Sequence, residues 1–303
     1  MRVLVNGLPL FAKRFTDELK KYDTKSNYIF LDTYNSKWKQ VLFFLYLPFS
    51  DCVISMNGVT DNSGSLNLVL KWKKKLILQW MGTDALLAME RFKNNTIERK
   101  YIDYAHNFVD SEWLMDEVKS LEVPVEYLHF KSVKVHPNEN KYDKISVISY
   151  VADTRQEFYG MQQIAEIART FPNIEFHLYG LTCSEFPTTP NIHFYGWVKP
   201  EEFAERLKST PIFLRLTEHD GFSVSVIEAL GFGCEVIMSL PFEFTHLAKN
   251  SNEAITIMNY VISKIEKRGM KPNHEMIEIV KLRYNPEKLA SNYIQKLKEV
   301  VGK

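Results

Sequence analysis

The chain has 303 residues, of which 45% are apolar, so it is long enough for about two domains with ordinary hydrophobic cores. Its 38 lysines and arginines nearly cancel its 37 aspartates and glutamates, so the charge gives no general attraction to nucleic acid, and we expect no nucleic-acid partner. The three cysteines, Cys52, Cys183 and Cys234, are far apart, which suits neither a disulfide framework nor a CxxC metal site and favours a reducing compartment.

The N-terminal stretch 1–11 has the pattern of a first strand and not that of a secretory signal. The longest apolar run, residues 41–49, is about half as long as a membrane-spanning helix requires. We therefore expect a cytoplasmic protein, either free or bound peripherally at the inner face of the membrane.

The first half of the chain alternates strand-like and helix-like segments. Apolar runs rich in Val, Ile and Leu predict strands, and apolar spacing of three to four residues predicts helices. The expected strands are 2–7, 27–33, 51–58, 74–84, 108–111 and 125–130. The expected helices are 10–22, 37–49, 96–107 and 112–122.

The segment 131–144 is polar and contains Pro137, so we expect it to be a linker. The second half then repeats the alternation. Its expected strands are 145–151, 174–180, 191–198, 211–217 and 234–239, and its expected helices are 159–171, 199–210 and 224–231. After a break at residues 284–286, the final segment 285–301 is expected to be a long amphipathic helix.

Repeated strand–helix alternation predicts parallel sheets with helices on both faces. The fold class is therefore α/β, with two doubly wound, Rossmann-like domains. We expect an N-terminal domain over residues 1–138, a C-terminal domain over 139–282, and a crossover helix over 283–303 that packs on the first domain. In such sheets ligands bind beyond the carboxyl ends of the strands.

The stretch EHDGFSVSVIEALGFG, residues 218–233, contains two acids in very different settings. Asp220 lies in a glycine-containing turn, and Glu228 lies inside an apolar helix whose start Ser223 could cap. A helix start favours an anion such as a phosphate, and Glu228 lies roughly 7 to 8 Å further along the axis. That separation is comparable to the one between a nucleotide's phosphates and its ribose hydroxyls, and a carboxylate can accept hydrogen bonds from two neighbouring hydroxyls.

The stretch 217–237, TEHDGFSVSVIEALGFGCEVI, resembles the nucleotide-sugar motif of GT-B-fold glycosyltransferases, particularly the retaining enzymes of glycosyltransferase family 4. That family usually has two glutamates eight positions apart, followed by Ala-Leu or Ala-Met and a glycine. A branch with the pattern R-x-T-x-x-D-G-x-S carries aspartate at the first position, and it is matched here by Arg215, Thr217, Asp220, Gly221 and Ser223.

Other segments resemble the family in the same order along the chain. They are LILQWMGTD and FVDSEWLMDEVKSL in the first half, NIHFYGWVKPEEFAERLKST before the motif, and NPEKLASNYIQKL at the end. The resemblance therefore spans most of the chain and implies two domains that face each other across a cleft. The first would be the acceptor side and the second the nucleotide-sugar donor side.

The resemblance implies a role for each matched residue. Glu228 would bind the ribose hydroxyls, and Trp197 and Val198 would flank the base. Asp220, as a catalytic residue, would contact the donor sugar. The donor sugar and phosphates would also meet the segment Gly221, Phe222, Ser223 and Val224.

The remaining assignments rest on segments that depart from the family pattern. Tyr159 stands where a phosphate-binding lysine is usual, so Arg155 is the best substitute and Arg215 the second. In the first half, Gly7 would let the backbone approach the phosphates. Asp84 would lie near the acceptor as a second catalytic residue, although Met81 replaces the family's histidine.

The implied reaction is transfer of a hexose from UDP- or GDP-sugar to a hydroxyl of a saccharide, lipid-linked or other acceptor, with retention of configuration. No two aspartates lie two positions apart, so we expect no metal site, a metal-independent mechanism, and no cofactor. Family members often dock on membranes, so a peripheral membrane contact is also expected. The donor base, sugar, acceptor and pathway are left open.

Each assignment has an ordinary structural alternative. Glu228 could be a surface charge, Asp220 a turn acid, Arg155 a solvated loop residue and Asp84 a helix cap. The aromatic residues of 41–49 are expected to be core more often than membrane contacts, although the lysines beside them suit an interfacial helix.

Two other functions fit the same architecture. One is a nucleotide-sugar epimerase, which the low histidine content around the motif disfavours. The other is a catalytically silent binding protein, which Met81 and Tyr159 support because both replace polar groups. A dinucleotide dehydrogenase is disfavoured because no G-x-G-x-x-G follows a strand.

Overall fold

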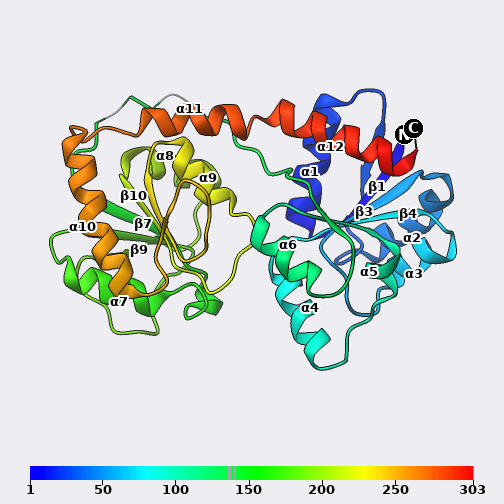
Figure 1. The fold of residues 1–303 in the computed structure, drawn as a ribbon, viewed down its shortest axis with the longest axis horizontal. Coiled ribbons are helices and arrows are strands. Elements are labelled where there is room, and N and C mark those ends of the chain that lie inside the picture. Colours follow the sequence, from blue (N-terminus) through cyan, green and yellow to red (C-terminus); the bar gives the residue numbers. More distant parts are fainter. Residues whose placement is uncertain (136–137, 140, 303) are drawn as a thin grey trace. The chain divides into compact units, whose positions relative to one another are not determined.

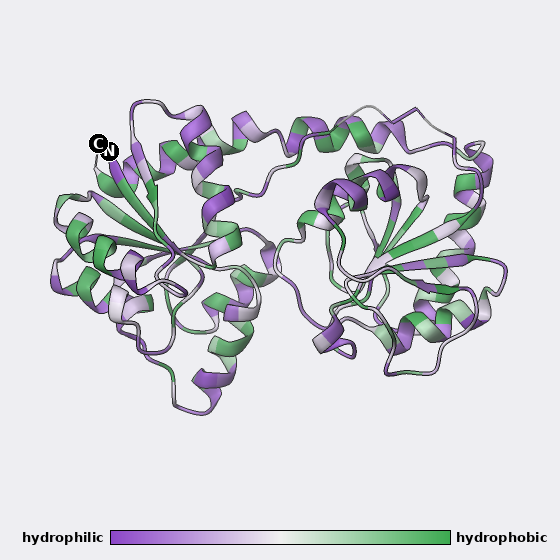
Figure 2. Ribbon diagram, turned by 180° about the vertical axis from the view of Figure 1, so that it is seen from behind, coloured by the Kyte–Doolittle hydropathy of each residue, from purple (hydrophilic) through white to green (hydrophobic). Residues whose placement is uncertain are grey.

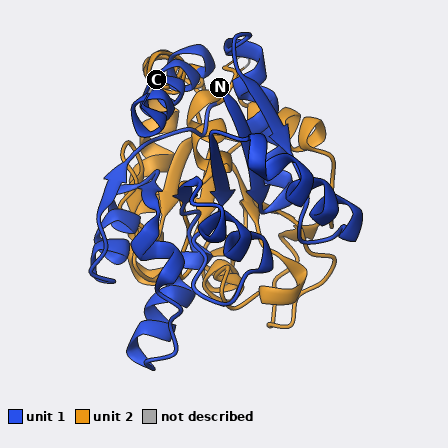
Figure 3. Ribbon diagram, turned by 90° about the vertical axis from the view of Figure 1, so that its right-hand side faces the viewer, with its two compact units in different colours: residues 1–132, 286–303 blue, residues 133–285 orange. Residues whose placement is uncertain are grey.

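The computed structural model describes residues 1–135, 138–139 and 141–302, which form two compact units. Unit 1 is Met1–Ser132 with Pro286–Lys303, and unit 2 is Val133–Asn285 (Figure 3). The change of unit therefore comes six residues before the expected boundary after residue 138, and the return to unit 1 comes at Pro286 rather than at residue 283. Pro137 of the predicted linker lies outside the described residues.

Unit 1 is built on a six-stranded, all-parallel sheet with the strand order β2-β1-β3-β4-β5-β6 (Figure 1). Its strands are β1 Arg2–Gly7, β2 Asn27–Phe30, β3 Cys52–Met56, β4 Lys75–Gln79, β5 His106–Val109 and β6 Val125–Tyr127. Its helices are α1 Pro9–Tyr22, α2 Lys37–Tyr46, η1 Leu47–Phe49, α3 Gly64–Lys71, α4 Thr83–Lys93, α5 Lys100–Tyr104, α6 Glu112–Lys119 and α12 Pro286–Val301.

Unit 2 has a second six-stranded, all-parallel sheet, in the order β12-β11-β10-β7-β8-β9. Its strands are β7 Ser146–Tyr150, β8 Glu175–Tyr179, β9 Ile192–Phe194, β10 Ile212–Arg215, β11 Glu235–Met238 and β12 His246–Leu247. Its helices are η2 Asp153–Arg155, α7 Met161–Thr170, α8 Pro200–Ser209, α9 Val224–Gly231, α10 Ser251–Lys267 and α11 His274–Arg283.

Both sheets are apolar on both faces, as the green central strands in Figure 2 show. The middle strands β3, β4, β10 and β11 are buried or nearly buried along their length. Helices must cover both faces of such sheets, which explains the continuous rather than alternating apolar pattern of these strands. The predicted α/β class with two doubly wound domains is confirmed.

The structure corrects several elements. The expected strand 74–84 ends at Gln79, and Thr83–Lys93 is the helix α4. The expected helix 96–107 is limited to Lys100–Tyr104, because its last residues enter strand β5. Helices α3, α10 and α11 occupy segments to which the sequence pattern assigned no element.

The segment predicted as a linker is packed against unit 2. Asn138 is buried, and its Nδ2 donates to the backbone oxygens of Lys208 (3.1 Å) and Phe232 (2.9 Å). Tyr142 is also buried and donates from its backbone N–H to the oxygen of Met270 at 2.8 Å. Asn138 and Tyr142 are therefore part of the packed structure of unit 2 and not of a free connection.

Helix α12 returns to unit 1 and completes its core. Tyr293 is fully buried, and its hydroxyl donates to Oε1 of the buried Gln79 at 3.1 Å. Its ring also lies edge-on to the rings of Phe15 (4.8 Å) and Phe108 (6.4 Å). One face of the first sheet therefore depends on the last residues of the chain.

Glu235 at the start of β11 is the most strongly paired buried acid of unit 2. Its carboxylate accepts hydrogen bonds from Arg268 (2.7 Å), Lys264 (3.0 Å) and His246 (3.1 Å). Burial by itself raises the pKa of Glu235, but the hydrogen bonds and charges of these three partners outweigh it and lower the pKa to about 2. The interactions of Glu235 with these three side chains therefore stabilise unit 2 only while its carboxyl group is ionised.

We predict that Glu235→Gln destabilises the protein by about 3 kcal/mol at pH 7. Because the folded-state pKa is lowered, this difference is fully present above the unfolded-state pKa of 4.5 and disappears as the pH falls toward 2. Urea denaturation of both proteins over this pH range measures it. Glu243→Gln, which removes a half-exposed partner of Arg283, is the control and should cost little at any pH. An unchanged difference down to pH 2 would contradict the prediction.

Candidate functional site

Each sheet contains one position at which the strand order reverses. In unit 2 the first strand, β7, lies between β10 and β8, so the connections leave it in opposite directions. In unit 1 the corresponding position lies between β1 and β3. Loops diverge at such a switch point and leave a crevice at the carboxyl ends of the strands, which is where open α/β sheets bind ligands.

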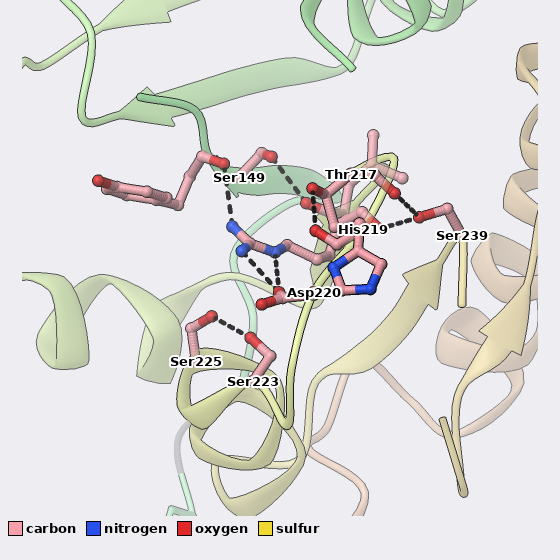
Figure 4. A network of polar contacts seen from close by, with 10 residues as sticks. Ser149, Thr217, His219, Asp220, Ser223, Ser225 and Ser239 are labelled. Atoms are coloured by element: carbon pink, nitrogen blue, oxygen red, sulfur yellow. Dashed lines mark hydrogen bonds and ion pairs between the residues drawn. The ribbon is translucent and has the colours of Figure 1, made fainter. Parts of the chain in front are cut away.

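In unit 2 an ion pair lies at this edge. Arg215 is the last residue of β10, and its guanidinium donates to Oδ2 of Asp220 from Nη2 (2.7 Å) and Nε (3.0 Å). The side chain of Arg215 is 8% exposed and that of Asp220 is 21% exposed. Figure 4 shows Asp220 between this guanidinium and Ser223 at the start of α9. The pair thus fixes the loop that connects the sheet to the helix of the motif.

Aromatic rings surround the arginine. Its guanidinium lies 5.0 Å from the ring of Tyr159 and 5.9 Å from that of Tyr150. The two tyrosine rings are edge-on to each other at 5.8 Å, and Tyr150 is edge-on to Trp197 at 6.2 Å. Trp197 is 77% exposed, so its ring is available to a planar ligand beside a partly buried aromatic cluster.

The loop after β7 is held against the motif loop by a close backbone contact. Gly160 has a φ of +73°, and a Cβ there would lie 2.2 Å from the backbone oxygen of Leu216. The N–H of Glu218 donates to the oxygen of Phe158 at 2.8 Å. Only glycine fits the close approach at 160, which brings Tyr159 over Arg215.

The two candidate phosphate-binding arginines differ in their surroundings. Arg155 is exposed on η2, with its guanidinium 3.7 Å from the centre of the Phe158 ring. Arg215 lies at the end of β10, next to the switch point, but Asp220 already neutralises its charge. Arg215 therefore binds the carboxylate of Asp220 and packs against the tyrosine rings, whereas Arg155 lies at the edge of the loop after β7.

The start of α9 lies next to this pair. Ser223 occupies the N-cap position, as predicted, but its hydroxyl contacts the hydroxyl of Ser225 (3.0 Å) instead of capping a backbone N–H. The N–H groups of the first helical turn have no partner within a helix. Gly221 and Phe222 are buried, Val224 is half-buried, and Val198 is half-buried beside Trp197.

Glu228 lies in the second turn of α9 and is half-buried, between the buried residues Ile227 and Ala229. It is therefore not a fully exposed surface charge. Four of the predicted site residues belong to unit 2 and lie on elements that reach the carboxyl edge of its sheet. They are the acids Asp220 and Glu228, Arg215, and Trp197, which is predicted to flank the base. Their roles toward a ligand stay predictions.

In unit 1 the carboxylate of Asp84 is occupied by backbone donors. It accepts hydrogen bonds from the N–H groups of Gly82 (2.7 Å), Met81 (3.0 Å) and Ala85 (3.1 Å), and also from Gly58 in the neighbouring loop. Burial raises the pKa of Asp84, and these hydrogen bonds oppose the rise. This geometry supports the alternative in which Asp84 organises the start of α4 and joins two loops; a catalytic role stays a prediction.

Gly7 ends β1 at the switch point of the first sheet. Its φ is +100°, and a Cβ there would lie 2.5 Å from the backbone nitrogen of Met56 at the end of β3. Glycine is thus required by the approach of two strand ends, independently of any ligand. Met81, which replaces the family's histidine, is buried in the core of unit 1.

A pocket of about 630 Å³ opens next to Gly7. Neutral polar side chains from several elements line it: Asn6, Thr33, Gln40, Ser55, Ser63 and Ser65. Among the residues that the structure describes, Asp61 is the one carboxylate of the lining, and no lysine, arginine or histidine lines the pocket. Asn6 is 2% exposed, and its Oδ1 has no hydrogen-bond partner among the described residues. A buried acceptor without a partner among these residues can accept a hydrogen bond from a water molecule or from a ligand in the pocket.

Sequence analysis missed Tyr150 and this pocket. Tyr150 could have been suspected because it ends the first strand of the second half, where a switch point forms. The pocket draws on residues from 6 to 68, a region in which the sequence carries no ligand motif. Within the described part of the chain, no group of three or more His, Cys, Asp and Glu side chains is arranged to hold a metal ion.

No protein-family profile matches the chain, and no curated protein matches it by sequence. Solved structures do match. Sucrose-phosphate synthase from Thermosynechococcus elongatus superposes with a TM-score of 0.73, at 10% identity over 100% of this chain and 99% of that one. Anabaena HepE, in complex with UDP and glucose, gives 0.68 at 10% identity over 98% and 99%. The chain thus has the GT-B glycosyltransferase fold.

The pneumococcal O-GlcNAc transferase GtfA, in complex with UDP and GlcNAc, gives a TM-score of 0.61 at 10% identity over 88% of this chain. This chain spans 61% of the length of that protein. A candidate UDP-N-acetylglucosamine 2-epimerase from Listeria monocytogenes gives 0.56 at 13% identity over 98% and 96%. Transferases and an epimerase share the fold, so the fold alone does not choose between them.

We predict that Arg215 and Asp220 are energetically coupled. Asp220→Asn should cost about 2 kcal/mol of folding stability because it leaves a nearly buried guanidinium without its carboxylate. In a double-mutant cycle with Arg215→Met, the coupling energy should exceed about 1 kcal/mol. Urea denaturation of the four proteins measures both quantities, and additive effects would show that the pair does not hold the loop.

Proposed function

We propose that this protein is a glycosyltransferase that moves a hexose from a nucleotide-diphosphate sugar to an acceptor hydroxyl. The observation that carries the proposal is the arrangement in unit 2. Asp220, fixed by Arg215, and Glu228 lie at either end of the segment that starts α9, at the switch point of a parallel sheet. UDP in the structures of two similar folds, HepE and GtfA, supports UDP over GDP as the first nucleotide to test.

In this proposal the donor binds along α9. The first-turn N–H groups near Ser223 would hold the pyrophosphate, because a helix start offers unpaired donors and a partial positive charge. Glu228 would accept hydrogen bonds from the two ribose hydroxyls, and Trp197 and Val198 would flank the base. Asp220 would accept a hydrogen bond from a hydroxyl of the donor sugar, oriented by Arg215.

The charge that develops on the leaving diphosphate needs stabilisation. Arg215 is neutralised by Asp220, so we assign this role mainly to the amides at the start of α9, with Arg155, an exposed residue of η2, as the second candidate. We propose that the reaction needs neither metal nor cofactor, because the sequence lacks an Asp-x-Asp pair. Retention of configuration and assignment to family 4 rest on the motif resemblance alone.

The acceptor would bind in the pocket of unit 1. Its amide and hydroxyl side chains can donate and accept hydrogen bonds, as the hydroxyls of a saccharide require, and its volume of about 630 Å³ lies in the usual range for ligand sites. The described residues of the lining include no cationic side chain, which favours a neutral sugar over a phosphorylated one. A lipid-linked saccharide with a neutral terminal residue fits the same description.

We predict that Glu228→Ala weakens UDP binding by 10- to 100-fold, because hydrogen bonds to a charged group contribute about 1.5–3 kcal/mol. Isothermal titration calorimetry with UDP and GDP measures the effect. Glu218→Ala is the matched control, since Glu218 is an exposed glutamate on the loop that precedes α9, and it should leave the affinity unchanged. If wild-type protein binds no nucleotide diphosphate or nucleotide sugar, the proposal is wrong.

A second prediction concerns Asn6. Asn6→Leu keeps the side-chain size but removes the unpartnered buried acceptor, so the KM for the acceptor should rise about tenfold while the affinity for UDP stays the same. UDP release in the presence of an acceptor panel measures the first quantity, and calorimetry measures the second. A change in UDP affinity without a change in acceptor KM would contradict the assignment of the pocket.

The same assays separate the alternatives. Isomerisation of the donor sugar without an acceptor would identify an epimerase, for which the similar fold of the Listeria protein is the supporting observation. Saturable nucleotide-sugar binding with neither transfer nor slow donor hydrolysis would identify a silent binding protein.

A further inference from the structure

Tyr34 differs from the other residues that line the pocket of unit 1. It is 56% exposed, whereas Asn6, Thr33 and Ser55 of the same lining are buried. The buried polar side chains therefore form the floor of the pocket, and Tyr34 lies at its mouth. Among the described residues of the lining, the other aromatic residue is Phe43, which is buried. An exposed ring is thus present at one place in an otherwise polar opening.

The ring of Tyr34 is held from both ends. At its backbone, Oδ1 of Asp32 accepts hydrogen bonds from the N–H groups of Tyr34 (3.2 Å) and Asn35 (3.0 Å), which closes the turn that carries the ring. At its tip, Nδ2 of Asn57 donates to the Tyr34 hydroxyl at 3.1 Å, and Oγ of Ser55 donates to Oδ1 of Asn57 at 3.3 Å. Little side-chain freedom therefore remains to be lost when a ligand packs on this ring.

The exposed aromatic residues of helix α2 and η1 belong to a different surface. Phe44, Tyr46 and Phe49 are exposed, so the prediction that the aromatic residues of 41–49 are core is wrong for most of them. The described lining of the pocket includes Phe43 of this segment and none of these three. No helix among the described residues has the length and apolar character needed to cross a membrane. The peripheral membrane contact expected from the sequence stays a prediction.

The mouth of the pocket beside Tyr34 is polar. Asp61 and Asn62 line it and are exposed. The carboxylate of Asp61 accepts a hydrogen bond from Nη2 of Arg91 at 3.1 Å, and Nη1 of Arg91 donates to Oγ1 of Thr60 at 2.8 Å. The acid is thus paired, and the mouth attracts neither charge strongly. An acyl chain on the ring would press hydrocarbon against these polar groups, whereas a sugar offers them hydroxyls.

The pocket has room for more than one hexose. Its volume is about 630 Å³. The twelve non-hydrogen atoms of a hexose occupy roughly 200 Å³, since covalently bonded atoms take less space than the roughly 30 Å³ of a liquid water molecule. One hexose can place its hydroxyls on the amide and hydroxyl groups of the floor. A pyranose also has a C–H face, which packs on the face of an aromatic ring such as that of Tyr34.

We propose that the pocket binds two linked hexoses of an oligosaccharide, one on the polar floor and its neighbour on the ring of Tyr34. This inference rests on the proposed function and names the class of its acceptor. Tyr34 is then a specificity-determining residue, because the ring adds affinity only for an acceptor with a second sugar. The reaction would follow an earlier glycosyl transfer, since its acceptor already contains a glycosidic bond.

The test compares disaccharides with their component sugars. Saturation-transfer NMR titrations of the full chain, with and without UDP, measure the Kd for maltose, cellobiose, lactose and chitobiose, and for the methyl glycosides of glucose, galactose and N-acetylglucosamine. At least one disaccharide should bind at least tenfold more tightly than both of its component sugars. Tyr34→Ala should weaken binding of that disaccharide about tenfold and change the affinity for the component sugars less than twofold.

Two further variants separate the ring from other effects. Tyr34→Phe keeps the ring and removes the hydroxyl, so it should keep most of the preference for the disaccharide. Tyr104→Ala is the matched control, because Tyr104 of unit 1 is 42% exposed, donates from its hydroxyl to the backbone oxygen of Lys74 (3.0 Å), and is not among the described residues of the lining. It should bind every sugar like wild type. Thermal unfolding curves show whether each variant is folded.

Three results would overturn the proposal: no disaccharide bound more tightly than its component sugars, an unchanged preference in Tyr34→Ala, or p-nitrophenyl monoglycosides bound more tightly than every disaccharide. In a protein that binds UDP, each would leave the proposed function standing with a different acceptor. Disaccharide binding in a protein that binds no nucleotide would instead contradict the proposed function, and with it the acceptor role of the pocket.

Discussion

The parallel direction of every strand pair is the constraint on which both candidate sites depend. Each strand delivers its carboxyl end to the same edge of the sheet, and the connecting helices must return on the two faces. The strand order reverses beside β7 in unit 2 and beside β1 in unit 1. At those two positions the loops separate, and they bring together Tyr150 with Arg215 in unit 2, and Asn6 with Ser55 in unit 1.

In unit 2 the Arg215–Asp220 pair joins the sheet to the helix that carries Glu228. A charge so nearly buried must be paired, and the pairing fixes the orientation of a carboxylate that could otherwise move with its turn. The consequence is that Arg215 has little charge left for a diphosphate. Tyr159, which stands where the motif resemblance implies a lysine, packs on the guanidinium. In the proposed function, stabilisation of the diphosphate would therefore fall mainly to backbone amides.

In unit 1 the two sides of helix α2 have different surroundings. Gln40 and Phe43 line the polar pocket, whereas Trp38 and Phe44 point away from the core into solvent. The half-buried Asp84 accepts backbone hydrogen bonds from Gly82 and Gly58 and so joins two loops of this half, and its catalytic role stays a prediction.

The sequence by itself determined the α/β class, the two repeated halves, the motif at 218–233 and the final helix, because each of these is a local pattern of apolar spacing, caps and glycines. It did not determine α4, because the residues up to its N-cap Gly82 continue the apolar pattern of the preceding strand. It also did not determine that Phe44 and Phe49 are exposed, because the apolar segment around them has the composition of a core. Only the tertiary structure decided that Tyr150 meets Arg215, that Asp220 neutralises it, and that Asn6 lies in a pocket with Ser65. Such contacts join residues from separate elements. The strand order decides which elements become neighbours, and it cannot be inferred from the pattern of any short segment.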